Sequence, residues 1–425
     1  MSTNKLSIFT QAVHAGERGP RPDFTPVVTP IYNSVGYLYE SMDQLDEVFA
    51  AEREGYVYPR YGTPTNAALE RAVAILEGGE AADGSEAAEV STAALSFASG
   101  MAAIHAALLA TGLEAGQAVV AAHDVYGATY ALLANLFTSL GMRVHFVDIA
   151  DLASVEQAIV EEKPQAIFCE IISNPLLKVA DVPAVAELAH AHGAEVIVDS
   201  TFATPYLAQP LTLGADYVVH SSTKYLGGHG DVLGGIVVTS EVETASAERR
   251  KRLWEIIKIT GGNLGPNQAW LTMRGLKTLP LRMAQHCRNA AAVAAWLAEA
   301  VFTSEHPKIA RVNYPGLPSH PQHDVATRLF REGCYGGMVS FEIAGADRAQ
   351  VFRFMEALKL VLPATTLGDV YSLALYPAHS SHRALSPEER AAIGIGEGLV
   401  RLSVGIEAVE DIIADLDQAL EQITV

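Results

Sequence analysis

The chain has 425 residues, of which 49% are hydrophobic, and a formal net charge of −20 at pH 7. This length predicts two or three domains with large apolar cores, and the acidic balance argues against nucleic acid or an anionic membrane as a partner. The apolar runs are too short for a membrane span, and the N-terminus lacks the pattern of a secretory signal. Three cysteines without metal-ligand spacing (Cys169, Cys287 and Cys334) predict a cytoplasmic protein with no metal site.

Residues 1–65 are rich in proline, tyrosine and glycine and show no clear periodicity, so we interpret them as an arm that packs on another surface. Residues 81–93 form an acidic segment with glycine and serine, which is typical of a surface loop. From Ala94 to Val238, short β-branched runs alternate with segments of helical period. This alternation predicts an α/β domain with a mostly parallel sheet covered on both faces, which we assign to residues 66–265.

The C-terminal part begins with a long alanine-rich helical stretch, from about Asn267 to Ala300. Beyond it, apparent strands and helices are mixed, at Met338–Ile343, Arg348–Ala357, Val400–Val404 and Glu410–Ile423. We therefore predict a second, smaller α/β domain over residues 266–425.

The most informative motif is a lysine flanked by hydroxyl groups and glycines, in the segment Ser221-Ser222-Thr223-Lys224-Tyr225-Leu226-Gly227-Gly228. Lysine prefers open water, and glycines leave the backbone bare where a ligand must approach closely. A cofactor aldehyde bound to Lys224 as a Schiff base would explain both features, because lysine is the usual nucleophile for that linkage.

Three further motifs lie where apolar runs end, which is the edge at which parallel sheets bind ligands. Asp199 ends one such run, Ser99-Gly100-Met101 opens an apolar helix, and Tyr126 stands between a strand and a helix. Considered alone, each motif has an ordinary interpretation: Asp199 as a turn residue, Ser99-Gly100 as a helix cap, and Tyr126 as a residue at the edge of the core. A helix N-terminus with glycine nevertheless offers N–H groups and a favourable dipole to a phosphate.

Four other polar residues have equally ordinary interpretations when each is taken singly. Asn174 stands in a turn before a proline, and Tyr58 and Arg60 stand in the arm, where a solvated loop would suffice. Arg401 interrupts an apolar strand. If that strand lies at the edge of its sheet, the arginine would simply face solvent. If Arg401 points inward, an anionic partner is expected, because a buried arginine without one is costly.

Together and in this order, the motifs resemble the Cys/Met-metabolism family of pyridoxal-phosphate (PLP) enzymes, from about residue 12 to the C-terminus. That family includes methionine γ-lyase, cystathionine γ-lyase, γ-synthase and β-lyase, and the O-acylhomoserine sulfhydrylases. The resemblance implies an aspartate-aminotransferase-like fold (fold type I), pyridoxal 5'-phosphate as the cofactor, and a cytoplasmic homotetramer built as a dimer of dimers. It also implies that the arm, residues 1–65, contributes to the neighbouring subunit's site.

The resemblance assigns a role to each motif. Lys224 binds the cofactor and moves protons, Asp199 keeps the pyridine nitrogen protonated, and Tyr126 stacks on the ring and protonates the leaving group. The phosphate is assigned to backbone and hydroxyl groups and to the neighbouring arm: Gly100, Met101, Ser221, Thr223, Tyr58 and Arg60. The ring oxygen is assigned to Asn174, and the substrate side of the site to Arg401, Thr366 and Tyr126. Two departures from the family pattern are Ser200, usually Asn, and Ile172, usually Pro.

Two positions bear on the member of the family. Val57 and Thr365 stand where relatives that handle cystathionine carry acidic residues, so the resemblance favours an uncharged γ-substituent. The segment Gly394–Leu399 resembles methionine γ-lyases, although Ala128 stands where many of them have cysteine. We therefore expect γ-elimination of methionine γ-lyase type, from L-methionine to methanethiol, 2-oxobutyrate and ammonia. Three alternatives remain. The first is a cystathionine γ-lyase or γ-synthase, and the second is an O-acylhomoserine sulfhydrylase acting by γ-replacement on an O-acylated amino acid. The third is a catalytically silent binding protein.

Overall fold

The computed structural model describes residues 25–50, 52–78, 94–239, 244–303, 308–381, 383 and 386–423. By its internal contacts the chain divides into two compact units, residues 1–30 and 31–425. The described residues of the first unit contain no helix or strand, and every element named below belongs to the second unit. The loop predicted at 81–93 and much of the predicted arm lie outside the described residues.

A seven-stranded sheet occupies the part of the chain in which alternating strands and helices were predicted. Its spatial order is β1-β7-β6-β5-β4-β2-β3. Strands β2 to β6 pair in parallel, whereas β7 is antiparallel to both of its neighbours. The strands are β1 (Ala94–Phe97), β2 (Ala118–Ala122), β3 (Arg143–Val147), β4 (Ala166–Glu170), β5 (Glu195–Asp199), β6 (Tyr217–His220) and β7 (Gly235–Thr239). The predicted mostly parallel sheet is confirmed.

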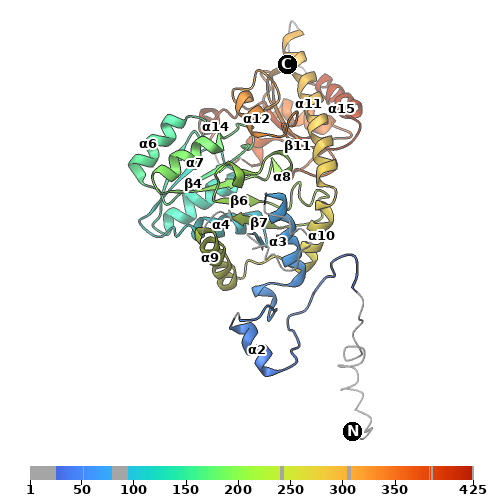
Figure 1. The fold of residues 1–425 in the computed structure, drawn as a ribbon. Coiled ribbons are helices and arrows are strands. Elements are labelled where there is room, and N and C mark those ends of the chain that lie inside the picture. The colour runs from blue at the N-terminus through green and yellow to red at the C-terminus, as the bar shows by residue number, and fades with distance from the viewer. Residues whose placement is uncertain are drawn as a thin grey trace. The chain divides into compact units, whose positions relative to one another are not determined.

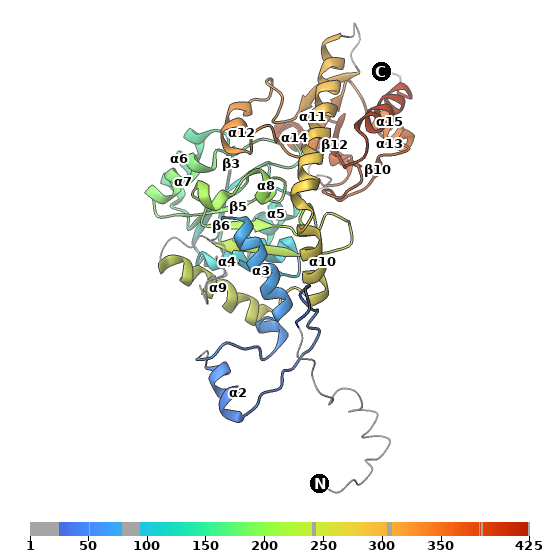
Figure 2. The same cartoon turned by 45° about the vertical axis from the view of Figure 1, so that its right-hand side comes forward.

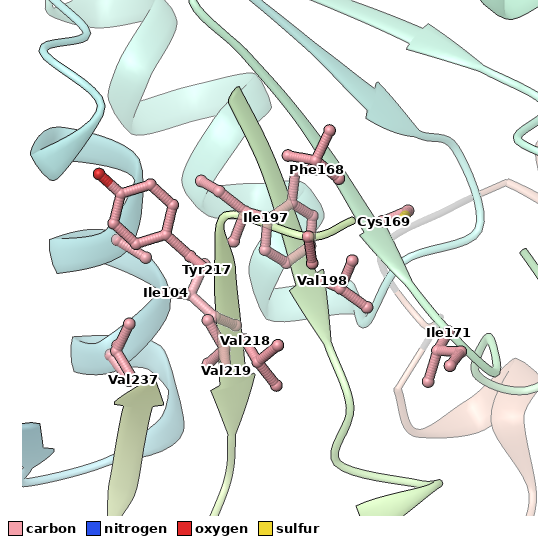
Figure 3. Close-up of a cluster of buried hydrophobic side chains, with 14 of the residues drawn as sticks. Ile104, Phe168, Cys169, Ile171, Ile197, Val198, Tyr217, Val218, Val219 and Val237 are labelled. Atoms are coloured by element: carbon pink, nitrogen blue, oxygen red, sulfur yellow. The ribbon is translucent and has the colours of Figure 1, made fainter. Parts of the chain in front are cut away.

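The central strands of this sheet are apolar because helices cover both faces. Ile197, Val198 and Val218 are completely buried on adjacent strands. Figure 3 shows them with Tyr217 and with Ile104, which comes from a neighbouring helix. Fully burying a side chain of this size contributes roughly 1.5–3 kcal/mol, so the strands that carry the site at their ends are firmly held.

Helices surround the large sheet (Figure 1). Helix α4 packs on β5, β6 and β7, α6 on β2 and β3, and α7 on β5. Short side-chain caps start these helices, as where the Ser99 hydroxyl accepts the Ala102 N–H at 3.1 Å at the beginning of α4. The helices of this part are α2 (Met42–Phe49), α3 (Pro64–Leu76), α4 (Gly100–Ala110), α5 (Gly127–Ala131), α6 (Leu152–Glu162), α7 (Val182–Ala191), α8 (Thr204–Leu207) and α9 (Thr244–Thr260).

A second, five-stranded sheet lies in the C-terminal part, in the order β10-β11-β12-β9-β8. Only β10 and β11 pair in parallel. It has its own buried core, which includes Phe341 and Phe354. Its elements are β8 (Ile309–Asn313), α12 (His323–Leu329), β9 (Met338–Ile343), α13 (Arg348–Ala357), β10 (Leu362–Pro363), β11 (Leu373–Leu375), α14 (Pro387–Ala392), β12 (Leu399–Ser403) and α15 (Val409–Glu421). The domain boundary at residue 265 stays a prediction, because residues 31–425 cluster as one unit.

The long helix expected from 267 to 300 is two helices, α10 (Pro266–Leu276) and α11 (Leu279–Thr303). Pro280 has no N–H to donate to the preceding turn, so it would interrupt a continuous helix but is tolerated in the first turn of α11, where it stands. Helix α11 packs on α8 and also on β8 and α15, so it spans both sheet regions (Figures 1 and 2). No helix in the described part of the chain is both long and apolar enough to cross a membrane.

Candidate active site

A cavity of about 200 Å³ lies where the strands of the large sheet end. Its walls come from the ends of β4 and β5, the N-terminus of α4, the segments after β2 and β6, and β12 of the small sheet. Parallel sheets bind ligands at this edge. Nine of the residues predicted for the site line the cavity: Gly100, Met101, Tyr126, Asn174, Asp199, Ser221, Thr223, Lys224 and Arg401.

Asp199 is fixed by the turn that follows its strand. Its Oδ1 accepts the Thr201 N–H at 2.9 Å, and the Thr201 hydroxyl accepts the Ser221 N–H at 2.9 Å. Thr201 therefore ties the end of β5 to the segment that carries Lys224. Burial raises the pKa of Asp199, and the bonds from Thr201 oppose that shift. In the described part of the chain only Thr201 donates to this carboxylate, which leaves it capacity to accept another donor.

Lys224 reaches across to the small-sheet side of the cavity. Its Nζ donates a hydrogen bond of 2.9 Å to the Thr366 hydroxyl, which follows β10. Burial, and next the charge of Arg401, lower the pKa of Lys224 to about 8. A neutral amine is the nucleophilic form, so this environment prepares Lys224 to attack an aldehyde.

The N-terminus of α4 is packed closely against Ser221. A Cβ atom added to Gly100 would lie 2.9 Å from the Ser221 Cβ and 3.0 Å from its hydroxyl oxygen, so only glycine fits there. The first N–H groups of a helix have no intrahelical partner and attract anions. Thr223 is less available, because its hydroxyl donates to the Gly234 carbonyl at 3.2 Å. A phosphate contact from Thr223 would require that bond to break.

Arg401 points inward and is 3% exposed. Its guanidinium donates to the Asn174 side-chain oxygen at 3.0 Å and to the Thr366 carbonyl at 3.1 Å. Its Nε is buried and has no acceptor among the described residues. Burial lowers the pKa of Arg401 to about 10. A buried cation whose acceptors are neutral is suited to bind an anion.

Glu170 is a cavity residue that the sequence reasoning missed. It ends β4 directly opposite Asp199 of β5 and is 7% exposed. Its two carboxylate oxygens accept the backbone N–H groups of Tyr126, at 2.6 Å, and Asn174, at 3.1 Å. Burial, and next the charge of Asp199, raise the pKa of Glu170 well above its usual range. The sequence does carry a signal for Glu170, because an acidic residue ends a buried apolar run there. The same pattern identified Asp199.

Three predicted site residues do not line the cavity. Thr366 lies behind it, bonded to Lys224 as described. Tyr58 is 45% exposed, and the Arg60 guanidinium donates to the Lys258 carbonyl and lies 5.5 Å from the centre of the Tyr58 ring. A role of Tyr58 and Arg60 at a neighbouring subunit's site stays a prediction.

Comparisons with known proteins agree on the family. The model of the Cys/Met metabolism PLP-dependent enzymes matches residues 9–421. The chain is 42% identical to an L-methionine gamma-lyase of Fusobacterium nucleatum subsp. polymorphum over 424 residues, 100% of both chains. It is 41% identical to a cystathionine beta-lyase of Lactococcus lactis subsp. cremoris (strain MG1363), over 98% of this chain and 99% of the relative.

A solved structure gives the same result for the fold. The cystathionine gamma-lyase from Lactobacillus plantarum, complexed with L-serine, superposes with a TM-score of 0.80 at 37% identity over 93% of both chains. The α/β architecture is therefore the aspartate-aminotransferase-like fold type I that the resemblance implied. The chain belongs to the Cys/Met-metabolism family of PLP-dependent enzymes.

Proposed function

We propose that this protein is a carbon–sulfur lyase that catalyses γ-elimination on a sulfur amino acid, releasing methanethiol, 2-oxobutyrate and ammonia from L-methionine and water. The observation that carries the proposal is the convergence of Lys224, Asp199 and Arg401 on one cavity. They supply an amine nucleophile, a carboxylate for a pyridine nitrogen and a cation for a substrate carboxylate.

The residues present fit PLP. Glycine at position 100 places no side chain between Ser221 and the start of α4, so the backbone there is open to a phosphate. The spare accepting capacity of Asp199 suits a protonated ring nitrogen. When bound, PLP supplies an aldehyde that links to amines and a ring that draws electrons from the substrate carbon. The remaining contacts are assigned to Met101, Tyr126, Asn174, Ser221 and Thr223, with Tyr58 and Arg60 from a neighbouring subunit.

The chain's own residues then handle protons and orientation. Lys224, whose pKa is about 8, takes the proton from the substrate α-carbon, and its bond to Thr366 aims the amine across the cavity. Arg401 holds the substrate carboxylate through its guanidinium group, whose described acceptors are both neutral. The Tyr126 hydroxyl protonates the departing sulfur.

The lining of the cavity supports an uncharged γ-substituent. Thr365 is neutral, and Phe202, Leu233 and Leu367 supply apolar surface. No acidic side chain stands at position 57 or 365 to receive the distal ammonium group of cystathionine. A methylthio group matches this lining, and the 42% identical relative is an L-methionine gamma-lyase.

The test is 2-oxobutyrate release by the purified PLP-loaded protein from L-methionine and L-cystathionine in parallel, without added thiol. We expect methionine to have the higher kcat/KM and Thr365→Glu to shift the preference towards cystathionine, whereas the uncharged Thr365→Gln should not. A preference for cystathionine in the unaltered protein would contradict the reading of positions 57 and 365. Slow release from both substrates would indicate a γ-replacing synthase instead.

We further propose that the protein is a cytoplasmic homotetramer, a dimer of dimers in which Tyr58 and Arg60 complete a neighbouring site. Arg60 lies away from its own chain's cavity, and the described arm carries exposed apolar residues such as Leu38 and Phe49. Light scattering would give the subunit number. Coexpressed Lys224→Ala and Arg60→Ala chains, each inactive alone, should regain activity in mixed dimers, because one of the two sites then carries neither change.

A further inference from the structure

Glu170 makes two hydrogen bonds that join separate parts of the cavity wall. Its Oε1 accepts the backbone N–H of Tyr126, which follows β2, at 2.6 Å. Its Oε2 accepts the backbone N–H of Asn174, which follows β4, at 3.1 Å. Both oxygens of one buried carboxylate are therefore used to fix the backbone of two residues that line the cavity.

These bonds continue to the substrate side of the cavity. The Asn174 side-chain oxygen accepts a hydrogen bond of 3.0 Å from Arg401. A continuous chain of contacts thus runs from Tyr126 through Glu170 and Asn174 to Arg401. No hydrogen bond from the side-chain nitrogen of Asn174 is found among the described residues, so its two hydrogens can serve a ligand.

Placing a carboxylate at this point carries an electrostatic penalty. Asp199 lies directly opposite Glu170 on the next strand, and Asp124, which is 1% exposed, is close enough to raise the pKa of Glu170 further. Arg401 is a cation close enough to interact with Glu170. A neutral acceptor would fix one N–H group without adding a third buried negative charge. A carboxylate, unlike a side-chain amide, directs an accepting oxygen at each of the two N–H groups, which meet different oxygens of the Glu170 side chain.

We propose that Glu170 is a positioning residue that holds Tyr126 and the Asn174–Arg401 pair as one unit. Stacking on the cofactor ring and binding of the substrate carboxylate are then set by the same side chain. The inference rests on the proposed function for what Tyr126 and Arg401 contact, and it adds a coupling between the two contacts.

The test compares Glu170→Gln with Asp124→Asn in the PLP-loaded protein. The glutamine keeps the size of Glu170 but turns an NH₂ group towards one of the two N–H donors. The asparagine removes a neighbouring buried negative charge whose oxygens bond to no described residue, so it serves as the matched control. Two readouts avoid turnover: visible circular dichroism of the bound cofactor, and spectral titration with glycine, which has a carboxylate but no group to eliminate.

For Glu170→Gln we expect the dichroic band to fall by about half and the Kd for glycine to rise about tenfold, the loss of one hydrogen bond to a charged group. Asp124→Asn should change neither by more than about twofold. If Glu170→Gln leaves both readouts unchanged, or if Asp124→Asn changes them equally, the positioning role is wrong. Should Glu170→Gln not fold, Glu170→Asp, too short to reach both N–H groups, is measured with the same expectation.

The unaltered protein separates this inference from the proposed function. An absorbance band of the lysine-bound cofactor that responds to glycine must be present before the variants are compared. Its absence would overturn the proposed function and the inference together. If the band is present but the Glu170 variants leave the dichroic band and the Kd for glycine unchanged, only the inference about Glu170 is overturned.

Discussion

Burial pushes the ionisable groups of the cavity towards their neutral forms, whereas a buried acid in the small-sheet region is held in its charged form. Burial raises the pKa of Glu170 and lowers that of Lys224 to about 8, so both are pushed towards their neutral forms. Asp415 in α15 is also buried, and burial alone would raise its pKa. Three backbone N–H groups, each donating at 2.8 Å to its carboxylate, outweigh burial and hold the pKa of Asp415 below its usual range.

The difference is one of complete against incomplete pairing. Asp415 receives the N–H groups of residues 359–361 and a further bond from Gln418, so its charge stabilises the loop that leads into β10. Asp199 and Arg401 keep unused bonding capacity in the absence of a ligand. Groups of the first kind stabilise the fold, whereas groups of the second kind weaken the ligand-free protein and become favourable when a charged ligand arrives.

The largest expected effect is that of Lys224→Ala. Removing the nucleophile should lower turnover by on the order of 10³-fold or more and abolish the absorbance of lysine-bound cofactor. Because alanine also removes an amine whose charged form is disfavoured by burial, urea unfolding of the cofactor-free variant should show no loss of stability. Persistent turnover would contradict the mechanism, and strong destabilisation would contradict the idea that incompletely paired cavity groups weaken the ligand-free protein.

The next effect concerns Arg401→Lys. Lysine keeps the charge but cannot bond to Asn174 and Thr366 while presenting a further donor to the substrate, so kcat/KM should fall on the order of 10²-fold, mainly through KM. Arg311→Lys is the matched control. Arg311 lies on β8 of the same sheet in a surface ion pair of 3.1 Å with Glu342, and its replacement should change kcat/KM by less than about twofold. Equal effects of the two variants would refute a special role for Arg401.

Asp415→Asn should behave in the opposite way to the cavity variants. Losing the charge that three N–H groups bind should lower the free energy of unfolding by about 2 kcal/mol at pH 7 while kcat/KM stays unchanged. Asp417→Asn, an exposed position on the same helix, should cost less than about 0.5 kcal/mol. Urea unfolding of the PLP-free proteins gives both values.

The same variant predicts a pH dependence. The folded pKa of Asp415 is depressed, so its contribution is fully present above the unfolded pKa of about 3.9 and is lost as pH falls through the folded value. The difference in stability between the unaltered protein and Asp415→Asn should therefore be constant from neutral pH down to about pH 5 and shrink in acid. A difference that grew in acid would have the wrong sign.

The smallest expected effect is that of Thr366→Val. It removes the acceptor of the 2.9 Å bond from the Lys224 amine and should lower kcat about fivefold, the equivalent of one ordinary hydrogen bond. Thr366→Ser keeps the hydroxyl and should stay within about twofold of the unaltered protein. If the serine and valine variants lose activity equally, the threonine methyl group and its packing matter more than the bond to Lys224.

The sequence allowed much of the fold and the principal cavity residues to be predicted, because strand ends in a parallel sheet converge on one edge. Asp199, Lys224 and Arg401 were recognised from motifs that each stand next to or within an apolar run. Glu170 was not, because its role depends on a contact with Tyr126, 44 positions away in the chain. Local patterns do not report which N–H group a carboxylate will receive from another loop. The break before α11 was missed because one proline was not weighed against a long run of helix-forming residues.

In evolutionary terms, the placement of Thr365 separates substrate range from chemistry. Thr365 is exposed and follows β10, a two-residue edge strand. By contrast, Asp199 ends the longer strand β5, and Arg401 lies within the longer strand β12. If the proposed role of Thr365 holds, we expect a substitution there to alter which γ-substituent is accepted while the bonds around the lysine and the arginine stay intact. Relatives of almost equal identity to this chain, 42% and 41%, carry the names of different lyases. Overall similarity alone therefore does not decide which γ-substituent a member of the family accepts.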